Sequence, residues 1–165
     1  MNKILKNNSL IFYFLIVFIG IFTIWHQLNF EDFWLDEMNS FWVADPNITF
    51  EELHQRQKKI DFHNPILFNF LLKQFLNLTE YNPSYARFLT FIFGSISIFF
   101  FGILSYQVKK NNSFLLTTLL ASLSIYLIKY SQEVRPYSLL LMLSVINIYL
   151  YLVILNKSHR KIIYK

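Results

Sequence analysis

The sequence predicts an all-α integral membrane protein with about four transmembrane helices and a large first loop on the non-cytoplasmic side. Of the 165 residues, 55% are hydrophobic and 15% are charged, well below the roughly 25% of charged residues in soluble domains. Four uncharged windows of 24, 21, 18 and 21 residues are each long enough to cross about 30 Å of hydrocarbon. Most cationic residues flank these windows, as expected for a chain whose main solvent is lipid.

The first transmembrane helix is expected over residues 9–28, within the uncharged window between Lys6 and Glu31. A basic start followed by an apolar run is also typical of a secretory signal. However, the residues at its exit, Trp25-His26-Gln27, are large or polar where a signal peptidase needs small side chains. We therefore expect an uncleaved membrane anchor.

The first loop is expected over residues 29–86, and it carries most of the charge of the molecule. Within it, residues 64–80 predict a helix, because polar side chains recur along one stripe at helical spacing. A helix with a lysine at its centre fits better flat in the membrane interface, with this stripe toward water, than across the hydrocarbon. The stripe consists of Asn69, Lys73, Asn77 and Glu80.

The other three spans are expected over residues 87–108, 112–129 and 136–156, followed by a cytoplasmic tail over 157–165. Pro136 fits the first turn of the last span, where a backbone N–H has no helical partner in any case. These segments belong to one membrane domain, since no linker separates them.

The positions of the charges predict a cytoplasmic N-terminus. With four crossings, eight cations and no acid lie on the cytoplasmic side, and all ten acids lie on the other side. Short cytoplasmic loops rich in lysine and arginine set the orientation of membrane proteins. The abundance of residues with AT-rich codons indicates a bacterial source, so the expected location is the plasma (inner) membrane, with several crossings.

Composition excludes several kinds of site. The chain has no cysteine, which removes disulfides, thiolate metal ligands and cysteine nucleophiles. Its four histidines show no spacing typical of a zinc site, so we predict no metal ligands. The net charge of +5 does not arise from basic runs interleaved with exposed aromatics, so we expect the lipid bilayer, and not nucleic acid, as a partner.

Two adjacent carboxylates, Asp36 and Glu37, follow Trp34 just beyond the first span. Carboxylates near hydrocarbon tend to have raised and coupled pKa values, which suits one of them to accept a proton near neutral pH. The pair also fits the solvated first turn of a helix, where acids interact favourably with the macrodipole. The segment alone leaves both interpretations open.

A second polar stretch connects the last two spans, from Lys129 to Ser138. Arg135 can hold an anionic group by a forked pair of hydrogen bonds, or it can neutralise a neighbouring acid at the lipid headgroups. The candidate residues of this stretch are Tyr130, Gln132, Glu133, Arg135 and Tyr137.

Two further candidates are His63, in the turn before the expected interfacial helix, and Arg87, at the start of the second span. Each of these two residues also has an interpretation in which it takes no part in a functional site. A single histidine is often a hydrogen-bonded interfacial residue, and an arginine at the end of a span often extends toward the headgroups.

Taken in order, these segments resemble the N-terminal part of the GT-C glycosyltransferases. The closest branch is protein-O-mannosyltransferase-like and includes the lipid A aminoarabinose transferases. The resemblance covers nearly the whole chain, although the His-Pro-Pro of the family is His63-Asn64-Pro65 here. Since family members run to several hundred residues with more spans, we expect this chain to be an N-terminal fragment. The other matching segments are Trp34-Leu35-Asp36-Glu37, Arg87 before a Phe-Gly-Ser helix, and Tyr130-Ser131-Gln132-Glu133-Val134-Arg135-Pro136-Tyr137-Ser138.

The resemblance implies an inverting hexosyl- or pentosyltransferase of the cell envelope. Such an enzyme takes a sugar from a polyprenyl-phosphate donor and transfers it to a protein, lipid or glycan acceptor on the non-cytoplasmic face. By resemblance, Asp36 is the base, Glu37 supports the orientation of the acceptor or ligand, and Arg87 and Arg135 contact the carrier phosphate. The same resemblance implies substrate contacts by Trp34, His63, Tyr130, Gln132, Glu133 and Tyr137.

The need for a divalent cation stays open, and so do two alternatives to an active enzyme. One is a non-catalytic or truncated membrane subunit derived from such an enzyme. The other is a small transporter, but the expected spans carry no charged residue of the kind that usually marks a transport pathway.

Overall fold

The computed structural model describes residues 2–26, 28–60 and 65–163, with side chains described over 8–26, 28–60 and 65–156. This part of the chain is helical and contains no strand. Its helices are α1 (Asn2–Trp25), α2 (Leu35–Val43), α3 (Phe50–Ile60), α4 (Ile66–Leu78), α5 (Pro83–Lys109), α6 (Ser113–Ser122), α7 (Ile125–Ser131) and α8 (Tyr137–Ile163).

Three helices are long and apolar enough to cross a bilayer: α1 over Asn8–Trp25, the whole of α5, and α8 over Tyr137–Asn156. Helices α6 and α7 together have the length and composition of a fourth span, but they meet at a bend of 54°. The expected span over 112–129 thus corresponds to two helices that meet at a bend. Ser124 has extended backbone and its hydroxyl accepts the N–H of Leu127, so it caps a new helix.

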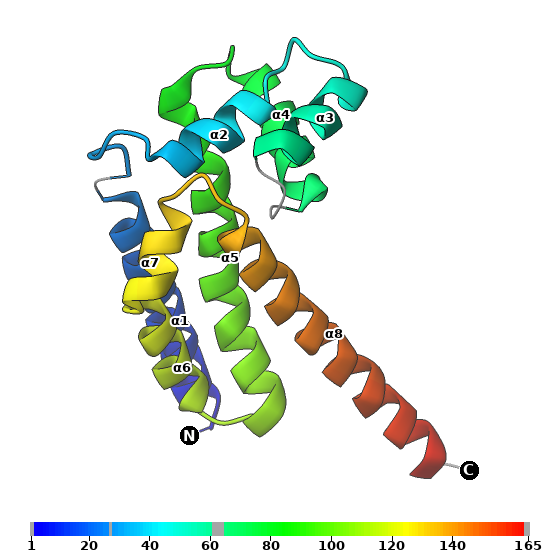
Figure 1. Ribbon diagram of the computed structural model, residues 1–165. Helices are drawn as coiled ribbons and strands as arrows, with labels where there is room; N and C mark the ends of the chain where they lie inside the picture. The colour runs from blue at the N-terminus through cyan, green and yellow to red at the C-terminus, as the bar shows by residue number, and fades with distance from the viewer. Residues whose placement is uncertain (1, 27, 61–64, 164–165) are drawn as a thin grey trace.

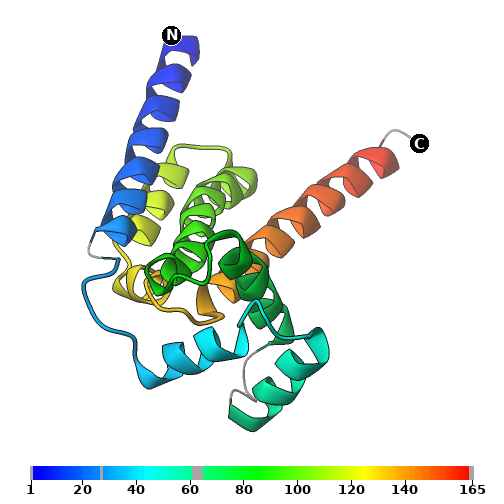
Figure 2. The ribbon, with the colours of Figure 1, turned by 90° about the horizontal axis from the view of Figure 1, so that it is seen from above.

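Helices α1, α5 and the α6–α7 pair lie side by side, whereas α8 diverges from them as it leaves the α7–α8 connection (Figures 1 and 2). Helices α2, α3 and α4 lie across one end of this bundle, called here the α2–α4 end. Helix α1 begins and α8 finishes at the opposite end (Figure 1). The connections between α1 and α2 and between α7 and α8 thus meet at the α2–α4 end.

Glycines of α1 and α5 let α6 and α7 approach closely. A Cβ added at Gly20 would lie 2.6 Å from Ser122 Oγ, and one at Gly94 would collide with Ser131. The Ser122 hydroxyl also donates across the helix pair to the carbonyl of Ile16, at 3.3 Å. Within hydrocarbon, close backbone approach and such hydrogen bonds hold helices together, since lipid is as apolar as a leucine side chain.

Helix α4 lies within the expected range of 64–80, but half of its polar stripe does not face water. Asn69 is fully buried, and the Lys73 ammonium donates to three carbonyls of the α2–α3 connection at 2.7–2.9 Å. The prediction that this stripe lies toward water is wrong for these two residues: Asn69 is enclosed by its neighbours, and three carbonyls replace water around the Lys73 ammonium. The exposed side of α4 instead carries Leu67, Phe70 and Leu78.

Candidate functional site

The adjacent acids Asp36 and Glu37 lie in different surroundings. Both lie in the first turn of α2, where successive side chains differ by about 100° around the axis. Glu37 is buried, with 1% of its side chain exposed, whereas 68% of the Asp36 side chain is exposed. The Glu37 carboxylate also accepts the backbone N–H of Trp34 at 3.2 Å, which caps the start of α2.

Arg87 of α5 donates two parallel hydrogen bonds to the Glu37 carboxylate. Its Nε lies 2.9 Å from Oε1 and its Nη2 lies 2.8 Å from Oε2. The other three N–H groups of the guanidinium donate to backbone carbonyls between α1 and α2. Because a guanidinium has five donors, none is left for a phosphate in this arrangement. The three carbonyls are those of Leu28, Glu31 and Asp32.

Glu37 joins a third segment through the backbone N–H of Val134, which donates to Oε1 at 2.8 Å. Each carboxylate oxygen therefore accepts two hydrogen bonds, which uses its lone pairs. A carboxylate occupied in this way holds the α7–α8 connection and the start of α2 against α5. Its geometry is that of a positioning group for the loops around it.

A polar cavity of about 270 Å³ lies between the α1–α2 connection and the C-terminal end of α7. Four of its lining residues are candidates from the sequence: Trp34, Arg87, Gln132 and Glu133. The other lining residues are Leu28, Phe30, Glu31 and Lys129.

Lys129 connects two walls of the polar cavity. Its Nζ lies 3.8 Å from Glu133 Oε1 and 5.5 Å from the centroid of the Trp34 ring. Burial raises the pKa of the Glu133 carboxyl above its usual range, and the Lys129 ammonium opposes this shift. The Glu133 carboxylate therefore becomes protonated at a higher pH than an ordinary glutamate does.

Gln132 also lines the polar cavity. Its amide nitrogen donates to the carbonyls of Ile24 and His26, at 2.8 and 2.9 Å. These bonds tie the end of α7 to the end of α1. They also use both amide N–H groups, so the oxygen remains as the acceptor for a ligand.

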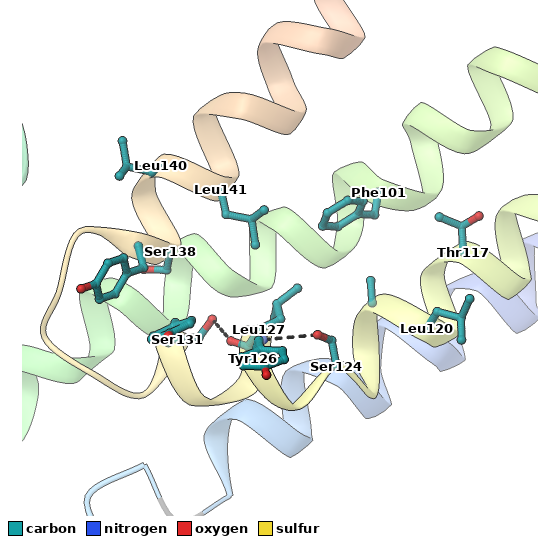
Figure 3. Close-up of a pocket in the computed structure, with 13 residues that line it drawn as sticks. Phe101, Thr117, Leu120, Ser124, Tyr126, Leu127, Ser131, Ser138, Leu140 and Leu141 are labelled. Carbon is teal, nitrogen blue, oxygen red and sulfur yellow. Dashed lines mark hydrogen bonds between the residues drawn. The ribbon is translucent and has the colours of Figure 1, made fainter.

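A larger apolar cavity of about 590 Å³ lies on the other side of α7, between α5, α6 and α8 (Figure 3). Leu141 and Leu127 point toward each other across it (Figure 3). Ser138 Oγ, also on its wall, is buried and has no hydrogen-bond partner in the described part of the chain. The lining comprises Phe101, Thr117, Leu120, Ala121, Ser124, Tyr126, Leu127, Tyr130, Ser131, Tyr137, Ser138, Leu140 and Leu141.

Helix α7 and its C-terminal end separate the two cavities. Leu127, Tyr130 and Ser131 line the apolar cavity, whereas Lys129, Gln132 and Glu133 line the polar one. Within α7 the helical period places Lys129 on a different face from Leu127, Tyr130 and Ser131, whereas Gln132 and Glu133 follow the end of the helix. One short helix thus borders the apolar cavity with its side chains, and the polar cavity lies at its C-terminal end.

Asp36 lines neither of these two cavities. Its Oδ2 lies 3.8 Å from Nη2 of Arg135, and the Arg135 guanidinium lies 5.9 Å from the Tyr137 ring centroid. The fold therefore brings the acidic segment after α1 next to the polar stretch before α8. His63 lies outside the described residues.

Several residues that line these cavities were not among the candidates from the sequence, and two of them carry polar groups of interest, Glu31 and Ser138. Glu31 lines the polar cavity and Ser138 lines the apolar one. Glu31 is one of two consecutive acids after α1, and nothing in the local sequence distinguishes it from Asp32. Ser138 lies within the resembling stretch, but its lack of a partner depends on the packing of α5, α7 and α8. Within the described ranges, no group of three His, Cys, Asp or Glu side chains could hold a metal ion.

Comparison of the chain with known protein families, with characterised proteins and with solved structures gives no match.

Proposed function

We propose that this protein is a membrane glycosyltransferase, or part of one, that uses a lipid-linked sugar. The observation that supports it best is the pair of cavities separated by α7. A polyprenyl-phosphate sugar has a long apolar chain joined to a polar head, and an apolar cavity beside a polar one offers a place for each. The resemblance of the segments around Asp36, Arg87 and Arg135 to GT-C glycosyltransferases agrees with this pairing.

In this proposal the chain crosses the membrane four times, with α6 and α7 as one broken span. The N-terminus is cytoplasmic, and α2, α3 and α4 lie on the non-cytoplasmic side of the plasma membrane. Irregular backbone inside a membrane is tolerated where its polar groups find partners within the protein. At the break, the Ser124 N–H donates to the carbonyl of Ala121 and the Ser124 carbonyl accepts the N–H of Ile128.

The proposed reaction is an inverting transfer. An acceptor hydroxyl attacks the anomeric carbon of the donor, the bond from that carbon to the phosphate oxygen breaks, and the lipid phosphate leaves with the electron pair. Asp36 accepts the proton of the hydroxyl, as a general base, and Arg135 stabilises the charge on the departing phosphate. The Glu37–Arg87 pair holds the segments that carry these two side chains.

A transfer assay in lipid nanodiscs tests this function. A panel of radiolabelled polyprenyl-phosphate hexoses and pentoses is incubated with the protein and cell-envelope acceptors, and both free polyprenyl phosphate and labelled acceptor are measured. We expect both products from at least one donor. Absence of donor binding and of both products across the panel contradicts the proposal.

The second candidate function is a non-catalytic membrane subunit that binds a lipid-linked sugar. The exposure of Asp36 favours it, because a base outside both cavities is not yet placed against a bound donor. In this case the protein binds the donor in the same nanodiscs, with no product formed. Donor retention and product formation therefore distinguish the two functions.

A further inference from the structure

The size of the polar cavity limits its ligand. Small-molecule sites usually enclose about 300–1,000 Å³, and this cavity, at about 270 Å³, lies just below that range. One pyranose or furanose ring fits this space, whereas a disaccharide exceeds it.

The charges of the cavity disfavour an anion. Its lining contains two acids, Glu31 and Glu133, and two cations, Lys129 and Arg87. All five donors of Arg87 are engaged within the protein. Only Lys129 is left to meet an added negative charge, and it already lies 3.8 Å from Glu133. A neutral ligand therefore fits better than a phosphate does.

The lining groups suit a ring that carries several hydroxyls. Each hydroxyl both donates and accepts. Glu133 and the amide oxygen of Gln132 accept, and the Lys129 ammonium donates. Trp34, a residue that is 56% exposed, adds an aromatic ring with an apolar face and a polar edge, of the kind that covers a ligand with both C–H and O–H groups.

We infer that the polar cavity is a subsite for one neutral sugar ring, in which Glu133 and Gln132 accept hydrogen bonds from its hydroxyls and Trp34 covers its C–H face. The inference rests on the proposed function, because it takes the ring to be that of the donor. Beyond the proposed function, the inference states that the carrier phosphate lies outside the polar cavity and that Glu133 binds the sugar ring.

Trp34 can report binding directly, because the chain has only three tryptophans. In a Trp25→Phe, Trp42→Phe variant of the full chain, Trp34 is the sole indole. This variant, in nanodiscs free of sugar detergents, is titrated with methyl glycosides of hexoses and pentoses, with methyl maltoside as a disaccharide, and with inorganic phosphate. We expect a saturable fluorescence change with at least one monosaccharide and none with phosphate.

The second arm adds Glu133→Gln, which preserves shape and removes the charge, or the matched control Glu51→Gln on α3. Loss of a hydrogen bond to a charged group is expected to weaken monosaccharide binding about tenfold in the first variant and to leave the second unchanged. Circular dichroism confirms that each variant is folded. Equal binding in both, a response to phosphate alone, or tighter binding of the disaccharide overturns the inference.

The outcomes also separate this inference from the proposed function. Monosaccharide binding without any transfer from lipid-linked donors rejects the transferase and leaves the subsite standing. If sugar transfer occurs and Glu133→Gln leaves the KM for the donor unchanged, the transferase stands and the subsite is rejected. No response of Trp34 to any methyl glycoside likewise counts against the subsite, whatever the transfer assay gives.

Discussion

Glu37 and Arg87 lie 50 residues apart in the sequence and form a buried ion pair through two hydrogen bonds of 2.8 and 2.9 Å. The same carboxylate accepts the N–H of Val134, so one side chain connects α2, α5 and the α7–α8 connection. Arg87 also lines the polar cavity and Glu37 adjoins Asp36 in the chain, which makes the pair the structural centre of the candidate site.

Replacement of Glu37 by Gln is expected to lower the free energy of unfolding by about 3–5 kcal/mol, because it leaves the Arg87 charge buried without its partner. The exposed Arg56–Glu52 pair provides a matched control, since its N–O distance is also short, 2.7 Å. Glu52→Gln should change stability by only about 0.3–0.5 kcal/mol. Equilibrium unfolding in detergent, followed by near-ultraviolet circular dichroism, measures both, and equal losses would contradict the central role of the buried pair.

The proposed orientation can be tested with single cysteines, because the chain has none of its own. Asn47, between α2 and α3, and Asn111, between α5 and α6, lie at opposite ends of the bundle. A membrane-impermeant maleimide should label Asn47→Cys in intact cells and label Asn111→Cys only after permeabilisation. The opposite pattern would place the α2–α4 end in the cytoplasm.

Asp36→Asn is expected to abolish sugar transfer, because the amide cannot accept the proton of the acceptor hydroxyl. The side chain is 68% exposed, so stability should change by no more than about 0.5 kcal/mol. Product formation in nanodiscs measures sugar transfer, and thermal unfolding measures stability. Glu51→Gln is the control for loss of an exposed charge. Unchanged transfer in Asp36→Asn would remove Asp36 from the mechanism.

Gly94→Ala is expected to destabilise the bundle by about 1–3 kcal/mol, because the new methyl group overpacks the contact with Ser131. Adding Ser131→Gly returns space at the same contact and should restore part of the loss. Thermal unfolding of the single and double variants measures this coupling. If the two changes only add their separate losses, the α5–α7 contact is not as close as the structure shows.

The raised pKa of Glu133 predicts a pH dependence with a definite sign. The carboxylate is the form that accepts hydrogen bonds from a sugar, so binding should fall as pH decreases. The decline should begin above the range of an ordinary glutamate, about pH 4.3. Fluorescence titration of Trp34 from neutral to acidic pH measures it, and Glu133→Gln should show no such decline.

The same shift affects stability in the other direction. Because the folded state holds the Glu133 proton more tightly than the unfolded chain does, stability falls as pH rises from the ordinary pKa through the raised one. Glu133→Gln should therefore gain stability over the wild type at neutral pH and lose that advantage at acidic pH. Unfolding curves at both pH values provide the measurement.

The sequence by itself determined which segments are apolar and helical. Hydropathy is a sum over neighbouring residues, so the uncharged windows matched α1, α5, the α6–α7 pair and α8 without knowledge of the fold. The start of α2 also depends on neighbouring residues, since the hydrogen bond between Glu37 and Trp34 spans three residues. The local sequence also placed Trp34, Gln132 and Glu133 among the candidates, and these residues line one cavity.

Only the tertiary structure decided how the candidates divide their roles. Whether Asp36 or Glu37 faces the core depends on Arg87 and Val134, which are 50 and 97 residues from Glu37 in the chain. The direction of Lys73 depends on three carbonyls of another loop. Partners so distant in the chain leave no local pattern, because a polar side chain takes the direction in which its hydrogen bonds are satisfied.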